Sequence, residues 1–164
     1  MAGLPATGKS TLARALAARL GGVTLDKDLI RAALFPTEDV EYTVAQDDFC
    51  MEVMLGTAEY LLRKDPTRVI FLDGRTFSRR YQVERAVAAA ERMGTPWRIV
   101  ECVCAEETAR RRLEQDRHHP AANRNWELYQ RLRDSFEPIE RPKIVISTDA
   151  VLAECVAALE KGCR

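Results

Sequence analysis

Residues 3–10 carry the feature that most constrains the fold. They read Gly-Leu-Pro-Ala-Thr-Gly-Lys-Ser, and an apolar helical pattern follows them. This is the G-x-x-x-x-G-K-[ST] pattern of a phosphate-binding loop. Its glycines let backbone N–H groups turn into one concavity, and the helix that opens at Lys9 adds the positive end of its dipole. A glycine loop that only caps a helix is the alternative, but the full pattern arises by chance in roughly 1% or fewer of chains this long.

The side chains of this loop have separate expected roles in nucleotide binding. Lys9 can reach the β- and γ-phosphates, and the Ser10 hydroxyl can ligate Mg²⁺. ATP and Mg²⁺ are therefore the expected cofactors. The residues expected to bind them are Gly3, Pro5, Ala6, Thr7, Gly8, Lys9, Ser10 and Thr11.

Hydrophobic periodicity predicts strands that alternate with helices along the 164 residues. The expected strands are 23–26, 68–73, 97–104 and 143–147, the second of them buried because its apolar run is continuous. The expected helices are 11–20, 28–35, 44–64, 79–93, 106–117, 125–136 and 150–161, with a loop at 37–43. This alternation predicts a three-layer α/β fold of the P-loop NTPase type, with a mainly parallel sheet and right-handed crossovers.

We expect one P-loop domain over residues 1–164, with a helical lid at about 112–126, because no repeat or linker interrupts the pattern. Only Met1 and Ala2 precede the loop, whereas such a loop normally follows a strand. The first strand is therefore expected to be largely absent from this chain, which would leave two strand ladders unpaired. We expect a native chain that begins further upstream, and a strand borrowed from a partner is the alternative.

Charge and composition limit the partners. Lys plus Arg equal Asp plus Glu at 25 each, so a strongly basic nucleic-acid-binding surface is not indicated. No apolar run approaches the roughly 18 residues of a membrane span, and no signal peptide precedes the loop. The five cysteines form no C-x-x-C pair, which favours free thiols in a reducing compartment. We expect a cytoplasmic protein that is a monomer or a weak dimer.

Two aspartates follow predicted strands at the edge where parallel sheets bind ligands. Asp73 ends the strand 68–73 and can hold Mg²⁺, directly or through water, although it could instead cap the next turn. Asp28 can accept the proton of an attacking hydroxyl, and Arg31 can fix a polar or anionic group of the acceptor. Asp26 competes with Asp28 for the role of base, and Asp28 could instead be the N-cap of a helix.

An arginine-rich segment runs from Arg110 to Arg124. Phosphoryl transfer needs positive charge over the migrating group, often from a mobile lid, so we expect two of these arginines to be catalytic. The alternative is a solvated helix face, because acidic residues alternate with the arginines. His118 and His119 are expected in a loop rather than at a metal site, since they lack nearby Cys or His partners.

These motifs together resemble the small P-loop kinases related to polynucleotide 5′-kinase, zeta-toxin and chloramphenicol phosphotransferase, which are grouped with AAA-type ATPases. The resemblance covers nearly the whole chain. It rests on residues 3–11, the Asp26-x-Asp28-x-x-Arg31 segment, Asp73, and the arginine lid before Phe136-Glu137-Pro138.

The resemblance implies specific roles. Asp28 would be the general base, and Arg31 would grip a phosphate of the substrate. Arg112 and Arg117 are the best matches to the catalytic arginines of the lid. Arg75, which follows Asp73-Gly74, adds a charge near the acceptor side and would suit an anionic acceptor.

The expected function is therefore an ATP-dependent kinase that transfers the γ-phosphate to a hydroxyl of a small-molecule acceptor. A polynucleotide 5′-hydroxyl kinase is the second hypothesis, less favoured because the net charge is zero. Two further hypotheses are an NTP-hydrolysing switch protein and an inactive fragment. A switch needs a residue that positions water, whereas Asp28 with Arg31 favours a base that faces a second substrate.

Overall fold

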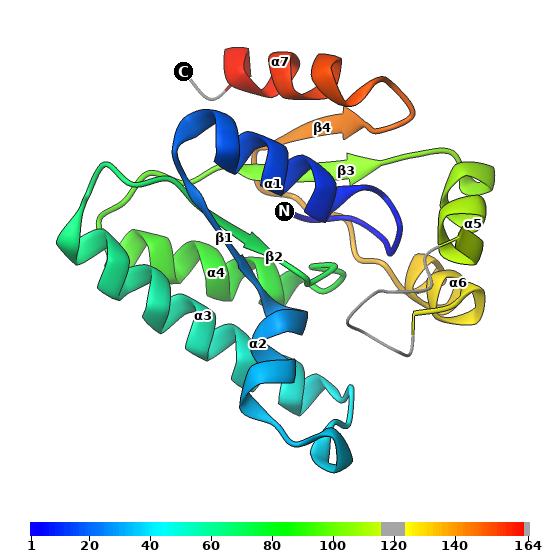
Figure 1. Ribbon diagram of the computed structural model, residues 1–164, viewed down its shortest axis with the longest axis horizontal. Coiled ribbons are helices and arrows are strands. Elements are labelled where there is room, and N and C mark those ends of the chain that lie inside the picture. The colour runs from blue at the N-terminus through cyan, green and yellow to red at the C-terminus, as the bar shows by residue number, and fades with distance from the viewer. Residues whose placement is uncertain (116–123, 163–164) are drawn as a thin grey trace.

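The computed structural model describes residues 1–115 and 124–162. Within these ranges, parallel strands alternate with α-helices (Figure 1). The elements are α1 (Lys9–Leu20), β1 (Val23–Asp26), α2 (Lys27–Leu34), a 3-10 turn (Thr37–Asp39), α3 (Val44–Lys64), β2 (Ile70–Asp73), α4 (Arg80–Arg92), β3 (Ile99–Val103), α5 (Glu106–Gln115), α6 (Trp126–Asp134), β4 (Lys143–Ser147) and α7 (Leu152–Gly162). The predicted α/β fold with parallel strands is confirmed.

The strands form two parallel pairs, β1 with β2 and β3 with β4, and the first two residues lie between the pairs. Ala2 donates its N–H to Val100 O at 2.7 Å and accepts from Cys102 N–H at 2.8 Å. The amino group of Met1 donates to Leu72 O at 2.9 Å. Met1 and Ala2 thus lie between the two pairs, where the expected first strand is reduced to a single parallel bridge between Ala2 and Glu101.

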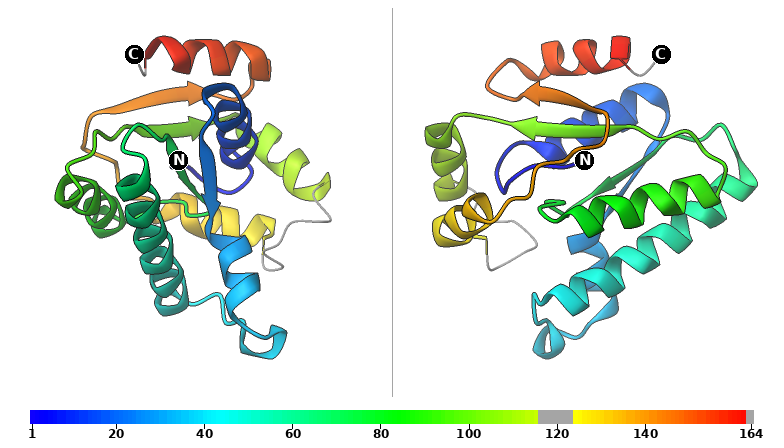
Figure 2. Two further views of the ribbon diagram at one scale, coloured as in Figure 1. Left: turned by 60° about the vertical axis from the view of Figure 1, so that its left-hand side comes forward. Right: turned by 180° about the vertical axis from the view of Figure 1, so that it is seen from behind.

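Helices cover both faces of the strands (Figure 2). On one face, α1 and α7 pack their apolar residues against β3 and β4, with Leu12 and Leu159 almost fully buried. On the other face, α3 and α4 supply a second cluster that includes Met54 and Val87. Both faces are apolar because a parallel sheet needs cover on each side. In the described ranges, no helix is long and apolar enough to cross a membrane.

The structure refines two local predictions. The segment predicted as a loop at 37–43 contains a 3-10 turn, because Asp39 N–H bonds to Pro36 O at 2.9 Å. The strand predicted as buried at 68–73 begins at Ile70, and its first three residues are only half-buried. Along the inner edge of β2, the amino group of Met1 bonds to Leu72 O, and Gly3 N–H bonds to Thr76 O at 3.0 Å just beyond the strand.

Candidate active site

The phosphate loop depends on glycines at both ends. Gly3 has φ +130°, and a Cβ there would lie 2.3 Å from Cys102 O. Gly8 has φ +79° and precedes α1 as its N-cap without a side-chain cap bond. The N–H groups of the first turn of α1 therefore lack a cap and can bind an anion.

Lys9 is buried at the floor of this loop. Its Nζ donates to Gly3 O at 2.9 Å and to Leu4 O at 2.7 Å. Burial lowers the pKa of Lys9 to about 8, although the charge of Asp73 acts in the opposite direction. The lysine is thus bonded to neutral carbonyl oxygens, which phosphate oxygens could replace.

Asp73 ends β2 and is 1% exposed. Neither of its carboxylate oxygens has a hydrogen-bond partner among the described residues. A buried carboxylate without a partner is costly, and a hard cation is a natural partner for its oxygens. Ser10 lines the cavity at the start of α1, so the donor set fits Mg²⁺. No group of three or more His, Cys, Asp or Glu side chains forms a metal cage in the described ranges.

Asp26 ends β1 directly beside Asp73, because the two are paired in the strand register. It is the N-cap of α2, since its Oδ1 accepts from Asp28 N–H at 2.9 Å and from Leu29 N–H at 3.4 Å. Burial, and then the charge of Asp73, raise the pKa of Asp26. The helix cap considered for Asp28 is therefore formed by Asp26, and the side chain of Asp28 is left for other contacts.

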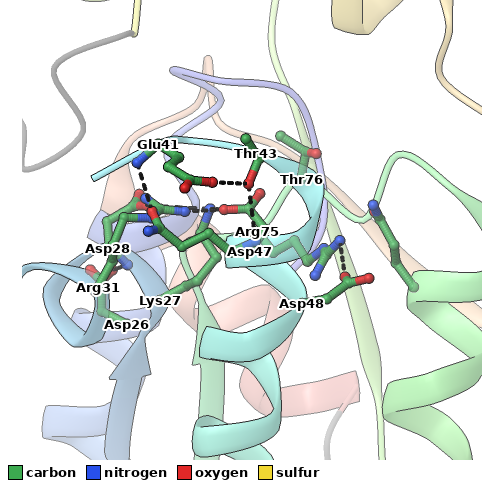
Figure 3. Close-up of polar contacts among 12 residues, drawn as sticks. Asp26, Lys27, Asp28, Arg31, Glu41, Thr43, Asp47, Asp48, Arg75 and Thr76 are labelled. Carbon is green, nitrogen blue, oxygen red and sulfur yellow. Dashed lines mark hydrogen bonds and ion pairs between the residues drawn. The ribbon is translucent and has the colours of Figure 1, made fainter. Parts of the chain in front are cut away.

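Asp28 belongs to a closed ring of two cations and two carboxylates (Figure 3). Arg31 donates to Asp28 Oδ1 at 2.7 Å, and Lys27 Nζ lies 3.3 Å from the same oxygen. Asp47, from the first turns of α3, closes the ring: its Oδ1 accepts from Lys27 at 2.7 Å and from Arg31. Lys27, Asp28 and Arg31 are all buried. The two cations hold one oxygen of Asp28 in a fixed place.

Arg75 forms a second ion pair with α3 (Figure 3). Its Nη2 lies 2.7 Å from Asp48 Oδ1 and donates to Tyr81 Oη at 3.3 Å. Arg75 is 5% exposed, and its Nε has no partner among the described residues. The neighbours Asp47 and Asp48 thus each contact one of the two arginines predicted to bind the acceptor.

The structure describes only part of the arginine-rich segment. Arg112 donates to Ala6 O at 3.2 Å, to Thr148 Oγ1 at 3.0 Å and to Thr148 O at 2.7 Å. It therefore ties α5 and the β4–α7 loop to the phosphate loop. Arg110 is exposed and pairs with Glu114, as expected of a solvated face. Arg117 and the two histidines lie outside the described residues.

One cavity of about 1280 Å³ joins these parts. The predicted residues that line it are Pro5, Ala6, Gly8, Lys9, Ser10, Thr11, Asp28, Arg31, Arg75 and Arg112. Gly3, Thr7 and Asp73 do not line the cavity. Gly3 shapes the phosphate loop instead, and Thr7 donates to Leu4 O at 2.8 Å. Sequence reasoning missed Lys27, Asp47, Tyr42 and Thr148, which also line the cavity. Only Lys27 carried a signal, because it stands inside the Asp26–Arg31 motif.

The fold and the phosphate loop define a P-loop NTPase domain. The chain belongs to the AAA domain family, whose model matches residues 1–139. Comparison with curated proteins gives no match.

Several solved structures share the fold. The APS kinase CysC of Mycobacterium tuberculosis, in complex with AMPPNP and APS, is 16% identical over 98% of this chain and 92% of that chain, with a TM-score of 0.73. A gluconokinase from Sinorhizobium meliloti 1021 is 17% identical over 99% and 92%, with a TM-score of 0.65. Chaetomium thermophilum Kti12, in complex with ADP-AlF3, is 16% identical over 99% and 95%, with a TM-score of 0.69. The chain therefore has the fold of P-loop kinases.

Proposed function

We propose that this protein is an ATP-dependent kinase that transfers the γ-phosphate of ATP to a hydroxyl of a small-molecule acceptor. The observation that carries the proposal is the single cavity that holds the phosphate loop and Asp28 together. A hydrolytic switch needs no ordered carboxylate on the acceptor side. A kinase needs one, positioned to receive a proton.

Asp28 is the proposed general base. Arg31 and Lys27 contact Oδ1, which orients the carboxylate and leaves Oδ2 to accept the proton of the acceptor hydroxyl. As this proton moves to Asp28, the hydroxyl oxygen bonds to the γ-phosphorus and the bond to the leaving oxygen of ADP breaks.

Residues 3–11 are proposed to bind the phosphates of ATP. Lys9 would exchange its carbonyl partners for phosphate oxygens, and the N–H groups at the start of α1 would bind the same anion. Ser10 and Asp73 would hold Mg²⁺, which neutralises charge on the β- and γ-phosphates. Arg112 and Arg117 are the proposed arginines of the lid, and Arg31 and Arg75 the proposed donors to the acceptor.

The small-molecule acceptor has support from the cavity and from the similar structures. Residues from α1 to α7 line the cavity, and four of its cations, Lys27, Arg31, Arg75 and Arg79, each pair with a carboxylate. An APS kinase and a gluconokinase, whose names specify small substrates, share the fold. We further propose that residues 1–164 form one kinase domain that acts in the cytoplasm as a monomer or weak dimer.

The test is a panel of hydroxyl compounds and a 5′-hydroxyl oligonucleotide, with ADP and phosphorylated product measured separately. We expect transfer to a small acceptor. We expect Asp28→Asn to lower kcat by roughly 10²- to 10⁴-fold while ATP still binds, as for loss of a general base. Asp26→Asn is the matched variant and should cost much less. The reverse order would place the base at Asp26, and ADP formation without any product would favour a switch.

A further inference from the structure

We propose that the acceptor is an uncharged, hydroxyl-rich small molecule and that Asp47 is the residue that excludes anionic acceptors. This inference rests on the proposed kinase function. It comes from a contrast inside the cavity: the cations at its two ends have different kinds of partners.

At the phosphate end, the cations Lys9 and Arg112 contact neutral oxygens. Within the described ranges, Lys9 Nζ bonds only to backbone carbonyls, at 2.9 and 2.7 Å. Arg112 bonds to two carbonyls and a hydroxyl. In the described part of the chain, every hydrogen bond of these two side chains goes to an uncharged oxygen. Their charge remains available for an anion, as nucleotide binding requires.

At the acceptor end, each cation already has a carboxylate. Arg31 and Lys27 are shared between Asp28 and Asp47. Since Arg31 is 2% exposed, its ion pairs lie away from water, where charges are screened little. An anionic group brought to this place would stand beside Asp47 and meet no net positive charge. A phosphate or carboxylate could be bound only if Asp47 were displaced.

The same arrangement occurs twice more along this wall. Arg75 pairs with Asp48 at 2.7 Å, and Arg79 lies 3.3 Å from Glu137. Lys27, Arg31, Arg75 and Arg79 thus form an acceptor wall in which each positive charge lies beside a carboxylate. Its other polar groups are hydroxyls and an amide, supplied by Thr76, Ser78, Tyr81 and Gln82. Neutral donors and acceptors of this kind match the hydroxyl groups of a sugar or cyclitol.

Arg31 and Arg75 can still bind such a molecule. The Nε of each is buried and has no hydrogen-bond partner in the described ranges. An orphaned donor of this kind is costly, and an oxygen of a polar ligand would satisfy it after a small shift of the side chain. Asp47, with its side chain 27% exposed, can in turn accept a hydrogen bond from a ligand hydroxyl.

The experiment compares matched acceptors that differ only in charge, such as an aldose with its aldonic acid and a pentose with its 5-phosphate. We expect kcat/KM, at saturating Mg·ATP, to favour the uncharged member of each pair by at least tenfold. Equal rates, or a preference for the anionic member, would overturn the inference while leaving the kinase function intact. Failure to phosphorylate any acceptor would instead overturn the proposed kinase function.

Asp47→Asn tests the residue itself. The substitution keeps the shape and releases one positive charge in the ring, so the preference for uncharged acceptors should fall by tenfold or more, with the KM for ATP unchanged. Glu52→Gln is the control, because it removes one charge from the same helix at an exposed pair with Arg85. The control should keep the preference of the parent. Asp47→Glu, which retains the charge, should restore selectivity; an unchanged preference in Asp47→Asn would mean that Asp47 does not select.

Discussion

Lys9 and Arg31 are both buried cations in one cavity, yet their partners differ. Lys9 lies against carbonyl oxygens, so burial dominates and its pKa falls to about 8. Arg31 lies between two carboxylates that share its charge. A lysine suits the first position because its pKa responds to burial, whereas an arginine stays charged in the second. The groups that contact each cation, carbonyl oxygens at Lys9 and carboxylates at Arg31, thus set the net charge at each end of the cavity.

The lowered pKa of Lys9 predicts a pH dependence of nucleotide binding. Phosphate oxygens stabilise the charged form and raise its pKa, so ATP binding takes up a proton above pH 8. Affinity for a non-hydrolysable ATP analogue should therefore weaken as pH rises through about 8. The stability of the nucleotide-free protein should change in the opposite direction. Between about pH 8 and 10.5, Lys9 binds more protons in the unfolded chain than in the folded one, so the free energy of unfolding rises with pH in this window.

Calorimetry in buffers of different ionisation enthalpy measures the proton uptake directly. Lys9→Ala supplies the control, because it removes the titrating group. This variant should bind nucleotide weakly, with no step near pH 8, and should lose turnover while remaining folded. Turnover within threefold of the parent would show that the phosphate loop has been assigned wrongly.

At the scale of the elements, the loop between Met1–Ala2 and α1 packs tightly against β3. A Cβ on Gly3 would lie 2.3 Å from Cys102 O, at a φ of +130° that other residues avoid. Gly3→Ala should therefore lower the free energy of unfolding by more than about 2 kcal/mol. Gly21→Ala is the matched control, because Gly21 has φ +65° with nothing within 4 Å of its Cβ. This control should cost about 1 kcal/mol in urea denaturation.

Equal losses in the two variants would show that the close approach of Gly3 to β3 is absent in solution. A severe loss in Gly3→Ala alone would support it. Because the same glycine shapes the phosphate loop, nucleotide affinity should fall with stability in Gly3→Ala and stay near the parent value in Gly21→Ala.

The elements also show which parts of the site a sequence can predict. The carboxyl ends of β1 and β2 were predictable, because parallel strands end at one edge and so bring Asp26 and Asp73 together. Asp47 was not, because its contact with Arg31 depends on how α3 packs beside α2, across 16 positions of sequence. The hydrophobic periodicity of a sequence predicts single helices, but it does not predict which residues of two helices come into contact. The role of Arg112 as a tie to Thr148 was hidden for the same reason.

Across the whole molecule, equal numbers of acidic and basic residues are distributed unevenly. Cations with neutral partners gather at the phosphate end of the cavity, and paired charges gather at the acceptor end. A net charge of zero therefore conceals a cavity in which Lys9 and Arg112 lie against neutral oxygens, whereas Lys27, Arg31, Arg75 and Arg79 are paired with carboxylates. This separation favours a kinase with one anionic substrate, the nucleotide, over one that also holds a nucleic-acid backbone.

The salt dependence of KM for the acceptor tests this separation on the whole protein. A single-stranded polynucleotide must be held through several phosphates, so log affinity should fall with log salt by about 0.7 per neutralised phosphate. A neutral acceptor should show almost no slope, with Mg·ATP kept saturating at each salt concentration.

A slope equal to one contact that disappears in Arg31→Ala would indicate a single anionic group on the acceptor, against the role inferred for Asp47. A slope equal to four or more contacts, with efficient phosphorylation of a 5′-hydroxyl oligonucleotide, would make the protein a polynucleotide kinase. We expect the flat response, because no cation of the acceptor wall formed by Lys27, Arg31, Arg75 and Arg79 lacks a carboxylate partner in the described structure.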